Sequence, residues 1–341
     1  MPSFEPRFMP LAIGSVPHKD PLEACKLILE HFPEIPCWPQ LPKRSFLENM
    51  YVQFSEGFPG LVLDENRIYV DRDKHVVEAE KLYSAILGNN LEHGEMGCSH
   101  ASGLFAFMDL LSGCGHRAVA VKGQVTGPVS WGLSVTDQDG QPLVYDDNLA
   151  DAVAKHLRLK AAWQEKKLRE VHPRTIIFVD EPYMNLFGSA FFPVSREKVV
   201  SLLEEVLTGL SGLRGVHCCG NTDWSLLLGL PIDILSFDAY QHADSLTLYP
   251  REVDGFLGRG GIIAWGIVPA NNRVRGENVD RLVKKLLLTM EKLASKGVPL
   301  ENVVSASLIT PSCGTGGLPR LEAEKVFKLT VGVAKAMQNR F

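Results

Sequence analysis

The stretch "TIIFVDEP" at residues 175–182 decides the fold, because a β-branched, apolar run stops abruptly at two carboxylates and a proline. An amphipathic pattern follows at 196–210, and a second apolar run, "LRGVHCC", occupies 213–219. Two apolar strands joined by a helix are typical of a parallel sheet whose faces are covered. Residues capable of chemistry stand where each predicted strand ends.

The same alternation continues along the whole chain. Apolar runs predicted as strands lie at 8–15, 34–40, 118–125, 175–182, 213–219, 232–238, 261–268 and 302–309. Helical spacing is clearest at 145–171, 196–210, 277–296 and 319–338. Eight strands separated by helices favour an α/β fold of the (β/α)8 TIM-barrel type over an open sheet. Because no repeat or linker interrupts the pattern, we expect residues 1–341 to form a single barrel domain.

Two segments depart from the barrel pattern. Residues 55–73 alternate apolar and polar side chains around "DEN", which predicts a β-hairpin inserted after the second strand. Residues 134–147 form a polar stretch after the third strand. Both follow the carboxyl ends of strands, where barrels of this type build their active sites.

Composition excludes several classes of protein. The formal net charge of −5 argues against a nucleic-acid binder, which needs a concentrated basic surface. The sequence contains no run of 18 apolar residues, so we expect no membrane span. Its first ten residues lack the basic and apolar regions of a signal peptide. Seven scattered cysteines, an odd number, indicate a reduced, cytoplasmic protein.

The most informative stretch is "GVHCCGNTDW" at residues 215–224. His217 and Cys219 are two residues apart on a strand, so their side chains point the same way and can reach one ion. Cys218 must point the opposite way. Cys313, in the glycine-rich stretch after the last strand, supplies a third ligand, and Asp238, at the end of the sixth strand, supplies a fourth. Two thiolates and an imidazole favour zinc over magnesium or calcium.

The other cysteines have a simpler explanation. A single cysteine on a strand or helix is usually a small buried apolar residue. We expect this of Cys25, Cys37, Cys98 and Cys114. A redox pair formed by the adjacent Cys218 and Cys219 is disfavoured, because redox enzymes usually space the two cysteines as C-x-x-C.

A thiolate-rich zinc site with a displaceable ligand is suited to a substrate thiol. The metal stabilises the deprotonated sulfur, which can then attack an electrophilic carbon. Transfer of a methyl group to a thiol is the obvious reaction of this kind.

These motifs resemble the cobalamin-independent methionine synthase superfamily, which includes uroporphyrinogen decarboxylase-like barrels and methylcobamide:coenzyme M methyltransferases. The H-x-C…C zinc signature of that superfamily is similar to "VHCCGNT" with "PSCG" here. Further stretches that resemble its catalytic C-terminal half, in the same order, are "AIGSVP" (12–17), "VKGQVTGPVSW" (121–131), "VDEP" (179–182), "DILSFD" (233–238) and "TPSCG" (310–314).

The resemblance implies roles for individual residues. His217, Cys219 and Cys313 match zinc ligands, and Asp238 stands where the family has a longer glutamate. Ser15, in the "IGS" stretch, and Asp180 match residues that hold the amino-acid part of homocysteine, and we expect Gly14 to bind substrate beside Ser15. We expect Gln40 and Glu181 to line the same pocket.

The departures from the family concern the methyl donor. The "HGE" substrate-binding segment after the second strand is replaced by "WPQLP" (38–42), the duplicated N-terminal half is missing, and "CGNT" is closer to the corrinoid-using enzymes. These features resemble the short "core" type of methionine synthase. They imply a methylcorrinoid donor, either free methylcobalamin or a corrinoid protein. Trp131 matches an aromatic residue associated with folate stacking, which keeps methyltetrahydrofolate as an alternative.

The leading hypothesis is therefore a zinc-dependent methyltransferase that makes methionine from homocysteine. The alternatives are transfer to another thiol such as a coenzyme, and a metal-free uroporphyrinogen decarboxylase-like enzyme, which needs arginines for its propionates. A corrinoid carrier or regulatory subunit is a fourth possibility, for which the sequence offers no cofactor-binding domain.

Overall fold

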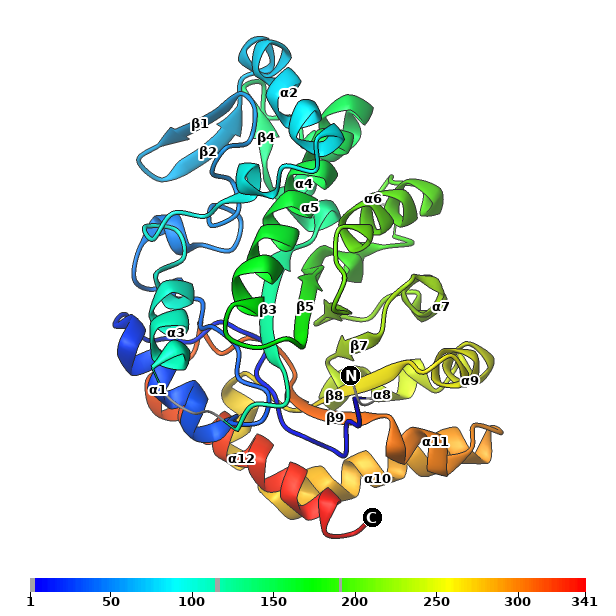
Figure 1. The fold of residues 1–341 in the computed structure, drawn as a ribbon. Coiled ribbons are helices and arrows are strands. Elements are labelled where there is room, and N and C mark those ends of the chain that lie inside the picture. Colours follow the sequence, from blue (N-terminus) through cyan, green and yellow to red (C-terminus); the bar gives the residue numbers. More distant parts are fainter. Residues whose placement is uncertain (1–3, 114–116, 190–191) are drawn as a thin grey trace.

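Six parallel strands form the central sheet of the computed structural model, which describes residues 4–113, 117–189 and 192–341 (Figure 1). Their order is β3-β5-β6-β7-β8-β9, so neighbours in the sheet are also successive in the chain. The strands span β3 Val121–Thr126, β5 Thr175–Asp180, β6 Leu213–Cys218, β7 Ile234–Phe237, β8 Ile262–Val268 and β9 Ser307–Pro311. The parallel sheet and the last six predicted strands are thus confirmed, with shifted ends.

The first two predicted strands are extended segments held by isolated bridges. Residues 8–16 lie beside β9, where Leu11 N–H donates to the Ile309 carbonyl at 3.0 Å. Residues 36–40 lie beside β3, where Lys122 N–H donates to the Pro36 carbonyl at 2.9 Å. The two segments join each other through the bridge between Ser15 and Gln40. The regular sheet therefore has six strands, and the other two segments run along its two edges.

A compact apolar cluster fills the space enclosed by the sheet and these two segments. Its buried members are Leu11, Ile35, Ala120, Ile176, Phe178, Ile234, Ile262, Ala264 and Leu308. Alternate residues of the same strands, such as Ile177 and Val179 on β5, belong to the larger core between the sheet and the helices. The strands are therefore buried on both faces, as a parallel sheet requires.

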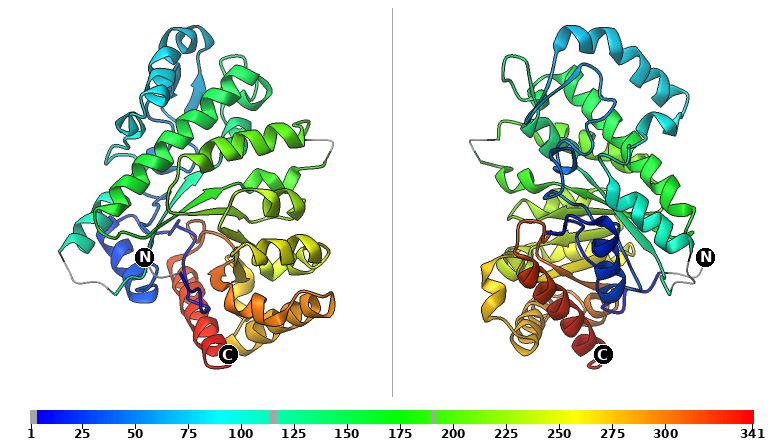
Figure 2. Two further views of the ribbon diagram at one scale, coloured as in Figure 1. Left: turned by 45° about the vertical axis from the view of Figure 1, so that its right-hand side comes forward. Right: turned by 90° about the vertical axis from the view of Figure 1, so that its left-hand side faces the viewer.

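Helices cover the outer face of the sheet, and α10 and α12 pack side by side (Figure 2). The helices are α1 Pro21–His31, α2 Arg72–Leu87, α3 Ser102–Ser112, α4 Pro128–Ser134, α5 Asp147–Arg169, α6 Arg196–Thr208, α7 Trp224–Gly229, α8 Ala239–Leu246, α9 Pro250–Gly258, α10 Val279–Ser295, α11 Leu300–Ser305 and α12 Arg320–Gln338. Short 3-10 turns lie at Phe46–Glu48, Leu91–Gly94, Leu143–Tyr145, Pro182–Leu186 and Asn272–Gly276.

Side-chain caps explain where several helices begin. Asp20 accepts a hydrogen bond from Glu23 N–H at the start of α1, and Ser195 accepts one from Lys198 N–H at the start of α6. Asp146 caps α5 in the same way. Each cap satisfies a backbone donor that the first helical turn leaves free.

The predicted hairpin is confirmed. Strands β1 (Leu61–Asp64) and β2 (Arg67–Val70) pair antiparallel, and β2 also pairs with β4 (Thr136–Asp137). This small sheet and α2 stand above the central sheet (Figure 1). Arg72, at the start of α2, donates hydrogen bonds to Asp137 of β4 at 2.7 Å and to Asp146, the cap of α5, at 2.8 Å, and so links the small sheet to α5.

Two sequence expectations are wrong. Residues 302–305 belong to helix α11 rather than to the last strand, because its β-branched valines pack on a helix face. Cys98 is exposed rather than buried, whereas Cys25 and Cys37 are buried as predicted. Cys114 lies outside the described residues.

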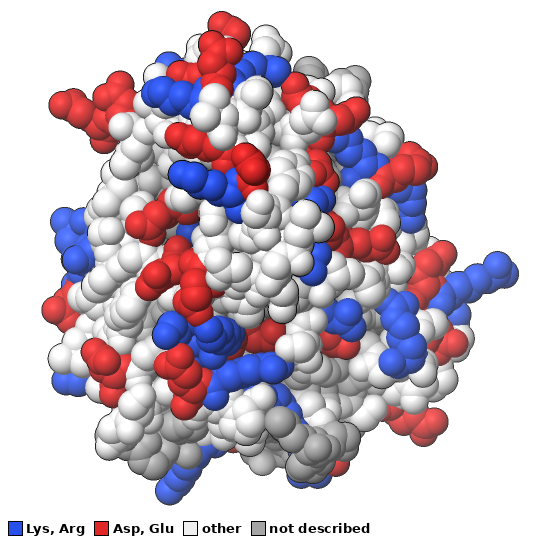
Figure 3. All heavy atoms as spheres, turned by 45° about the horizontal axis from the view of Figure 1, so that its top comes forward, with Lys and Arg blue, Asp and Glu red and all other residues white. Residues whose placement is uncertain are grey.

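The surface is mixed in charge. Acidic and basic side chains alternate over the face drawn in Figure 3. None of the helices in the described ranges combines the length and the apolar character needed to cross a bilayer.

Close packing of α3 against the second edge segment generates a prediction. A Cβ added at Gly103 would lie 1.9 Å from the Pro39 carbonyl oxygen, whereas one added at Gly229 meets nothing within 4 Å. We expect Gly103→Ala to lower the free energy of unfolding by about 1–3 kcal/mol, as overpacking does. Gly229→Ala, the control, should leave it unchanged or raise it slightly. Urea unfolding followed by circular dichroism measures both, and equal stabilities would contradict this packing.

Candidate metal centre

Three side chains from distant parts of the sequence meet at the carboxyl end of the sheet. His217 lies on β6, Cys219 is the first residue after the end of β6, and Cys313 lies shortly after the end of β9. Their ligand atoms all lie within 4.8 Å of one another. The structure thus brings together the three residues that the sequence proposed as a metal site.

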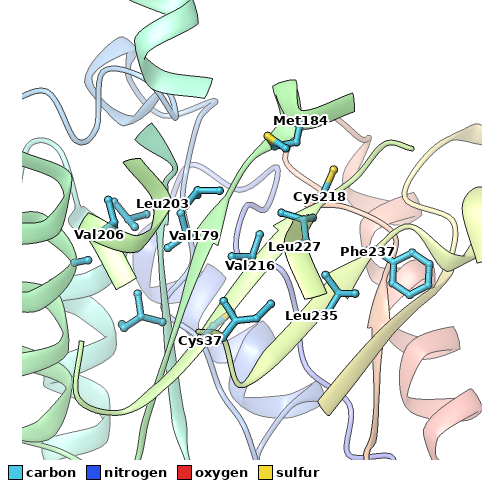
Figure 4. Packing of buried hydrophobic residues seen from close by; sticks show 14 of the residues in the cluster. Cys37, Val179, Met184, Leu203, Val206, Val216, Cys218, Leu227, Leu235 and Phe237 are labelled. Carbon is cyan, nitrogen blue, oxygen red and sulfur yellow. The ribbon is translucent and has the colours of Figure 1, made fainter. Parts of the chain in front are cut away.

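Strand alternation explains which cysteine of the pair belongs to the site. Cys218 points to the outer face of the sheet, where it is fully buried beside Val216, Leu227 and Met184 (Figure 4). His217 and Cys219, one residue to either side, therefore face the interior. The prediction that Cys218 is a packing residue is confirmed.

The surroundings of His217 suit a metal-binding imidazole. Its Nδ1 lies 2.9 Å from the Ser236 hydroxyl on the neighbouring strand, while Nε2 is buried and has no hydrogen-bond partner among the described residues. Burial lowers the pKa of the imidazole to about 3, so the ring is neutral. A neutral imidazole with one nitrogen engaged and the other free is the usual form of a metal-binding histidine.

The two thiols act as a pair. A hydrogen bond with the Cys313 thiol lowers the pKa of Cys219. The same hydrogen bond, together with burial, holds the pKa of Cys313 well above its ordinary value. Two sulfur donors and one free imidazole nitrogen fit a zinc ion that keeps a fourth position for another ligand.

Asp238 lies outside this three-residue group. Its carboxylate caps helix α8, with Oδ1 accepting from Gln241 N–H at 2.9 Å and Oδ2 from Gln241 Nε2 at 2.7 Å. Both oxygens therefore accept a hydrogen bond from the helix that follows, and the expected role of Asp238 as fourth ligand stays a prediction.

The three residues open onto a cavity of about 260 Å³. This volume is close to the lower end of small-molecule pockets, about 300 Å³. The described residues that line it are Ile13, Ser15, Gln40, Pro42, Glu48, Asn49, Met50, Asp180, Pro182, His217, Cys219, Cys313, Gly314, Gly316 and Gly317. Ser15, Gln40 and Asp180, all expected to bind substrate, thus stand beside the three candidate ligands.

Asp180 presents a free oxygen to this cavity. The residue is 8% exposed, and its Oδ1 is buried with no hydrogen-bond partner among the described residues. Burial raises the pKa of the carboxyl to about 7, although the nearby Lys122 ammonium opposes the shift. Such a group gains a partner when a cationic substrate binds.

Glu48 is a cavity residue that the sequence did not reveal. One carboxylate oxygen accepts hydrogen bonds from Arg44 at 2.8 Å and Ser102 at 2.7 Å. The other, Oε2, is buried without a partner among the described residues. No motif identifies Glu48, because only the tertiary structure carries the short turn Phe46–Glu48 to the cavity wall.

Glu181 has a different place from the one expected. Its carboxylate accepts hydrogen bonds from Val129 N–H at 2.9 Å and from Ser130 N–H at 2.8 Å, and thereby holds the start of α4. It is fully buried and is not among the cavity-lining residues. Burial raises the pKa of Glu181 to about 7 despite these hydrogen bonds.

Trp131 and Gly14 also stand behind the cavity wall rather than in it. The Trp131 indole is fully buried, donates to the Tyr51 carbonyl at 2.7 Å and packs against Phe58 with ring centroids 5.1 Å apart. Gly14 has φ +155°, and an added Cβ would lie 2.8 Å from Gln124 Cδ. The close approach of the Gln124 side chain therefore favours glycine at position 14.

Comparisons with known proteins concern the fold. No protein-family model matches the chain, and no curated protein sequence matches it. Among similar solved structures is a methyltransferase from Methanosarcina mazei, with TM-score 0.57 and 13% identity over 95% of this chain and 86% of that chain. This likeness over nearly the whole chain shows a shared fold.

A second similar structure is a B12-independent methionine synthase from Shewanella sp. W3-18-1, solved in complex with selenomethionine. Its TM-score is 0.46 and its identity 21%, over 65% of this chain and 63% of that chain. This chain thus spans less than two thirds of that enzyme's length.

The geometry of the two adjacent cysteines yields a prediction about metal binding. We expect the wild-type protein and Cys218→Ala to bind one zinc ion each, because Cys218 faces the core. Cys219→Ala should lose stoichiometric zinc, since a tetrahedral zinc site needs three protein ligands beside its open position. Competition with a chromophoric chelator measures the affinity. Retention of zinc by Cys219→Ala, or its loss in folded Cys218→Ala, would overturn the ligand assignment.

Proposed function

We propose that this protein is a zinc-dependent methyltransferase that converts homocysteine to methionine. The observation that carries the proposal is a single small cavity in which a His217–Cys219–Cys313 group stands beside two carboxylates with unpartnered oxygens, Asp180 and Glu48. A soft metal site accommodates a thiol, and the carboxylates accommodate an ammonium group. Homocysteine carries both.

Zinc held by these three residues supplies Lewis acidity that lowers the pKa of a substrate thiol. The side chains of the protein orient the substrate. Asp180 and Glu48 accept hydrogen bonds from the ammonium, and the Ser15 hydroxyl, whose oxygen accepts from Gly316 N–H at 3.3 Å, keeps its proton for the substrate carboxylate. The S–CH₃ bond forms as the bond from the methyl group to its donor breaks, and the thiol proton passes to solvent. Orientation of the sulfur supplies much of the rate.

The charge of the cavity favours an amino-acid thiol over an anionic coenzyme thiol. No lysine or arginine stands among the described cavity-lining residues, so a sulfonate or a propionate meets no fixed cation there. An ammonium meets two carboxylates instead, although Arg44 pairs with Glu48 at 2.8 Å and the Lys122 ammonium lies near Asp180. The absence of a cation from the described lining residues argues against both the coenzyme thiol and the uroporphyrinogen decarboxylase-like alternative.

We propose a methylcorrinoid, free or bound to a separate corrinoid protein, as the methyl donor. Trp131, the residue that kept a folate donor as an alternative, is enclosed by Phe58 and Tyr51 and offers no face for stacking. The sequence motifs that resemble the corrinoid-using branch of the superfamily point in the same direction.

The same proposal takes the fold as an eight-stranded (β/α)8 barrel of the cobalamin-independent methionine synthase superfamily. Its support is the interior cluster, which draws side chains from both edge segments, such as Leu11 and Ile35, as well as from the regular sheet. Hydrogen-bonded bridges link β9, the two edge segments and β3 in turn.

One assay tests both the identity of the methyl donor and the requirement for zinc. With homocysteine as acceptor, we expect methionine from methylcobalamin and none from methyltetrahydrofolate, and a zinc chelator should abolish the reaction because the thiol then stays protonated. Product formation is measured by mass spectrometry. Product from the folate alone would overturn the donor, and undiminished activity in metal-depleted protein would overturn the role of zinc.

The two carboxylates are tested by pairing substitutions with substrates. Asp180→Asn or Glu48→Gln should lower kcat/KM for homocysteine by about 10- to 100-fold, because a hydrogen bond to a charged group contributes about 1.5–3 kcal/mol. The acceptor 4-mercaptobutanoate, which lacks the ammonium, is the matched control and should be affected much less. Equal losses for both thiols would mean that neither carboxylate recognises the amine.

A further inference from the structure

Lys122 is a fully buried lysine that does not itself line the cavity. It lies on β3 with an exposed fraction of 0%. Its ammonium donates to the Ile13 carbonyl at 2.5 Å and to Gln124 Oε1 at 3.0 Å, and lies 4.5 Å from the centroid of the Phe178 ring. The Asp180 carboxylate is near enough to act on this ammonium electrostatically, but the hydrogen bonds of Lys122 go to neutral oxygens, one of them on the first edge segment.

Gln124 extends this contact to the second edge segment. It lies two residues beyond Lys122 on the same face of β3, and its Nε2 donates to the Trp38 carbonyl at 3.2 Å. The Gln164 side chain holds the backbone of Gln124 on both sides, accepting from its N–H at 2.9 Å and donating to its carbonyl at 3.0 Å. Gln124 is therefore itself fixed in place.

The two carbonyls held by these side chains occupy equivalent positions. The carbonyl that Lys122 binds belongs to Ile13, two residues before Ser15, and the carbonyl that Gln124 binds belongs to Trp38, two residues before Gln40. Two residues are one period of an extended strand, so the two contacts stand in the same relation to the cavity. Ser15 and Gln40 also face each other across an isolated bridge. Because neither edge segment is a regular strand, side chains supply hydrogen bonds that a full ladder would have made.

The side chains of Gln124 and Gln40 pack tightly against the backbone of the first edge segment at Gly14. A Cβ on Gly14 would lie 2.8 Å from both Gln124 Cδ and Gln40 Oε1. Gln40 is in turn oriented by its hydrogen bond to Gln53 at 2.7 Å. A shift of Lys122 or Gln124 is therefore transmitted to both cavity residues.

We propose that Lys122 and Gln124 form an internal clamp that positions Ser15 and Gln40, and that Lys122 is a positioning residue for the amino-acid part of the thiol substrate. The identity of the substrate rests on the proposed function. The clamp itself rests on the hydrogen bonds of β3 to the two edge segments.

The kinetic test compares Lys122→Met with Lys160→Met. Lys160 is an equally buried lysine whose ammonium donates to the Glu95 carbonyl at 2.7 Å, and it does not line the cavity. We expect Lys122→Met to retain stoichiometric zinc and to raise KM for homocysteine by about 10- to 100-fold with a smaller change in kcat, as misplacement of a binding group does. Lys160→Met should leave KM unchanged. An unchanged KM in Lys122→Met, or equal increases in both variants, would overturn the proposal.

A double-mutant cycle separates positioning from general destabilisation. If Lys122 acts through Ser15, Ser15→Ala should raise KM by much less in the Lys122→Met background than in the wild-type protein. Full additivity of the two substitutions would contradict the clamp.

Hydrogen exchange tests the clamp independently of substrate. Lys122→Met should accelerate exchange about 10-fold or more in peptides covering 8–18 and 34–42, and Lys160→Met should not. Gln124→Met is the second variant and should accelerate exchange mainly in 34–42. If the wild-type protein proves inactive with homocysteine, accelerated exchange still supports the clamp while the proposed function fails. Unchanged exchange at 8–18 in Lys122→Met overturns the clamp whatever the activity.

Discussion

The two-residue period of the parallel strands is the constraint on which the rest of this structure depends. On β5 the same period carries Ile176 and Phe178 into the interior cluster and Asp180 to the cavity above it. On β6 it brings His217 to that cavity and sends Cys218 to the packed outer face. The alternation of side chains along the strands therefore places both the apolar interior cluster and the polar cavity above it.

The cost of burying polar groups supports this cavity as the candidate functional site. A buried oxygen or nitrogen without a hydrogen bond is destabilising, and proteins keep such groups where a ligand completes them. His217 Nε2, Asp180 Oδ1 and Glu48 Oε2 are three such atoms around one small cavity. Their chemistry is complementary to a soft metal and a cationic group, whereas the carboxylates of Glu181 and Asp238 accept hydrogen bonds at helix starts.

Prediction from sequence succeeded where local pattern and tertiary structure agree. Strands β5 to β8 and the long helices follow from apolar runs and helical spacing, since burial on both faces leaves a clear signal. It was wrong about where the last strand begins, because the valines at 303–304 suit a helix face as well as a strand. It also predicted full strands at residues 8–15 and 34–40, which form only isolated bridges and are bonded by a few backbone groups together with side chains such as Lys122.

The sequence by itself determined the class of fold and the three soft donors, because strand period and residue chemistry are local properties. It also separated Cys219 from Cys218, since neighbouring residues on a strand face opposite ways. Only the tertiary structure decided that Glu48 lines the cavity while Trp131 does not, and that the Lys122 ammonium reaches the first edge segment while Gln124 reaches the second. Those placements depend on which distant segments meet, and the hydrogen bonds that decide between them connect residues far apart in the chain.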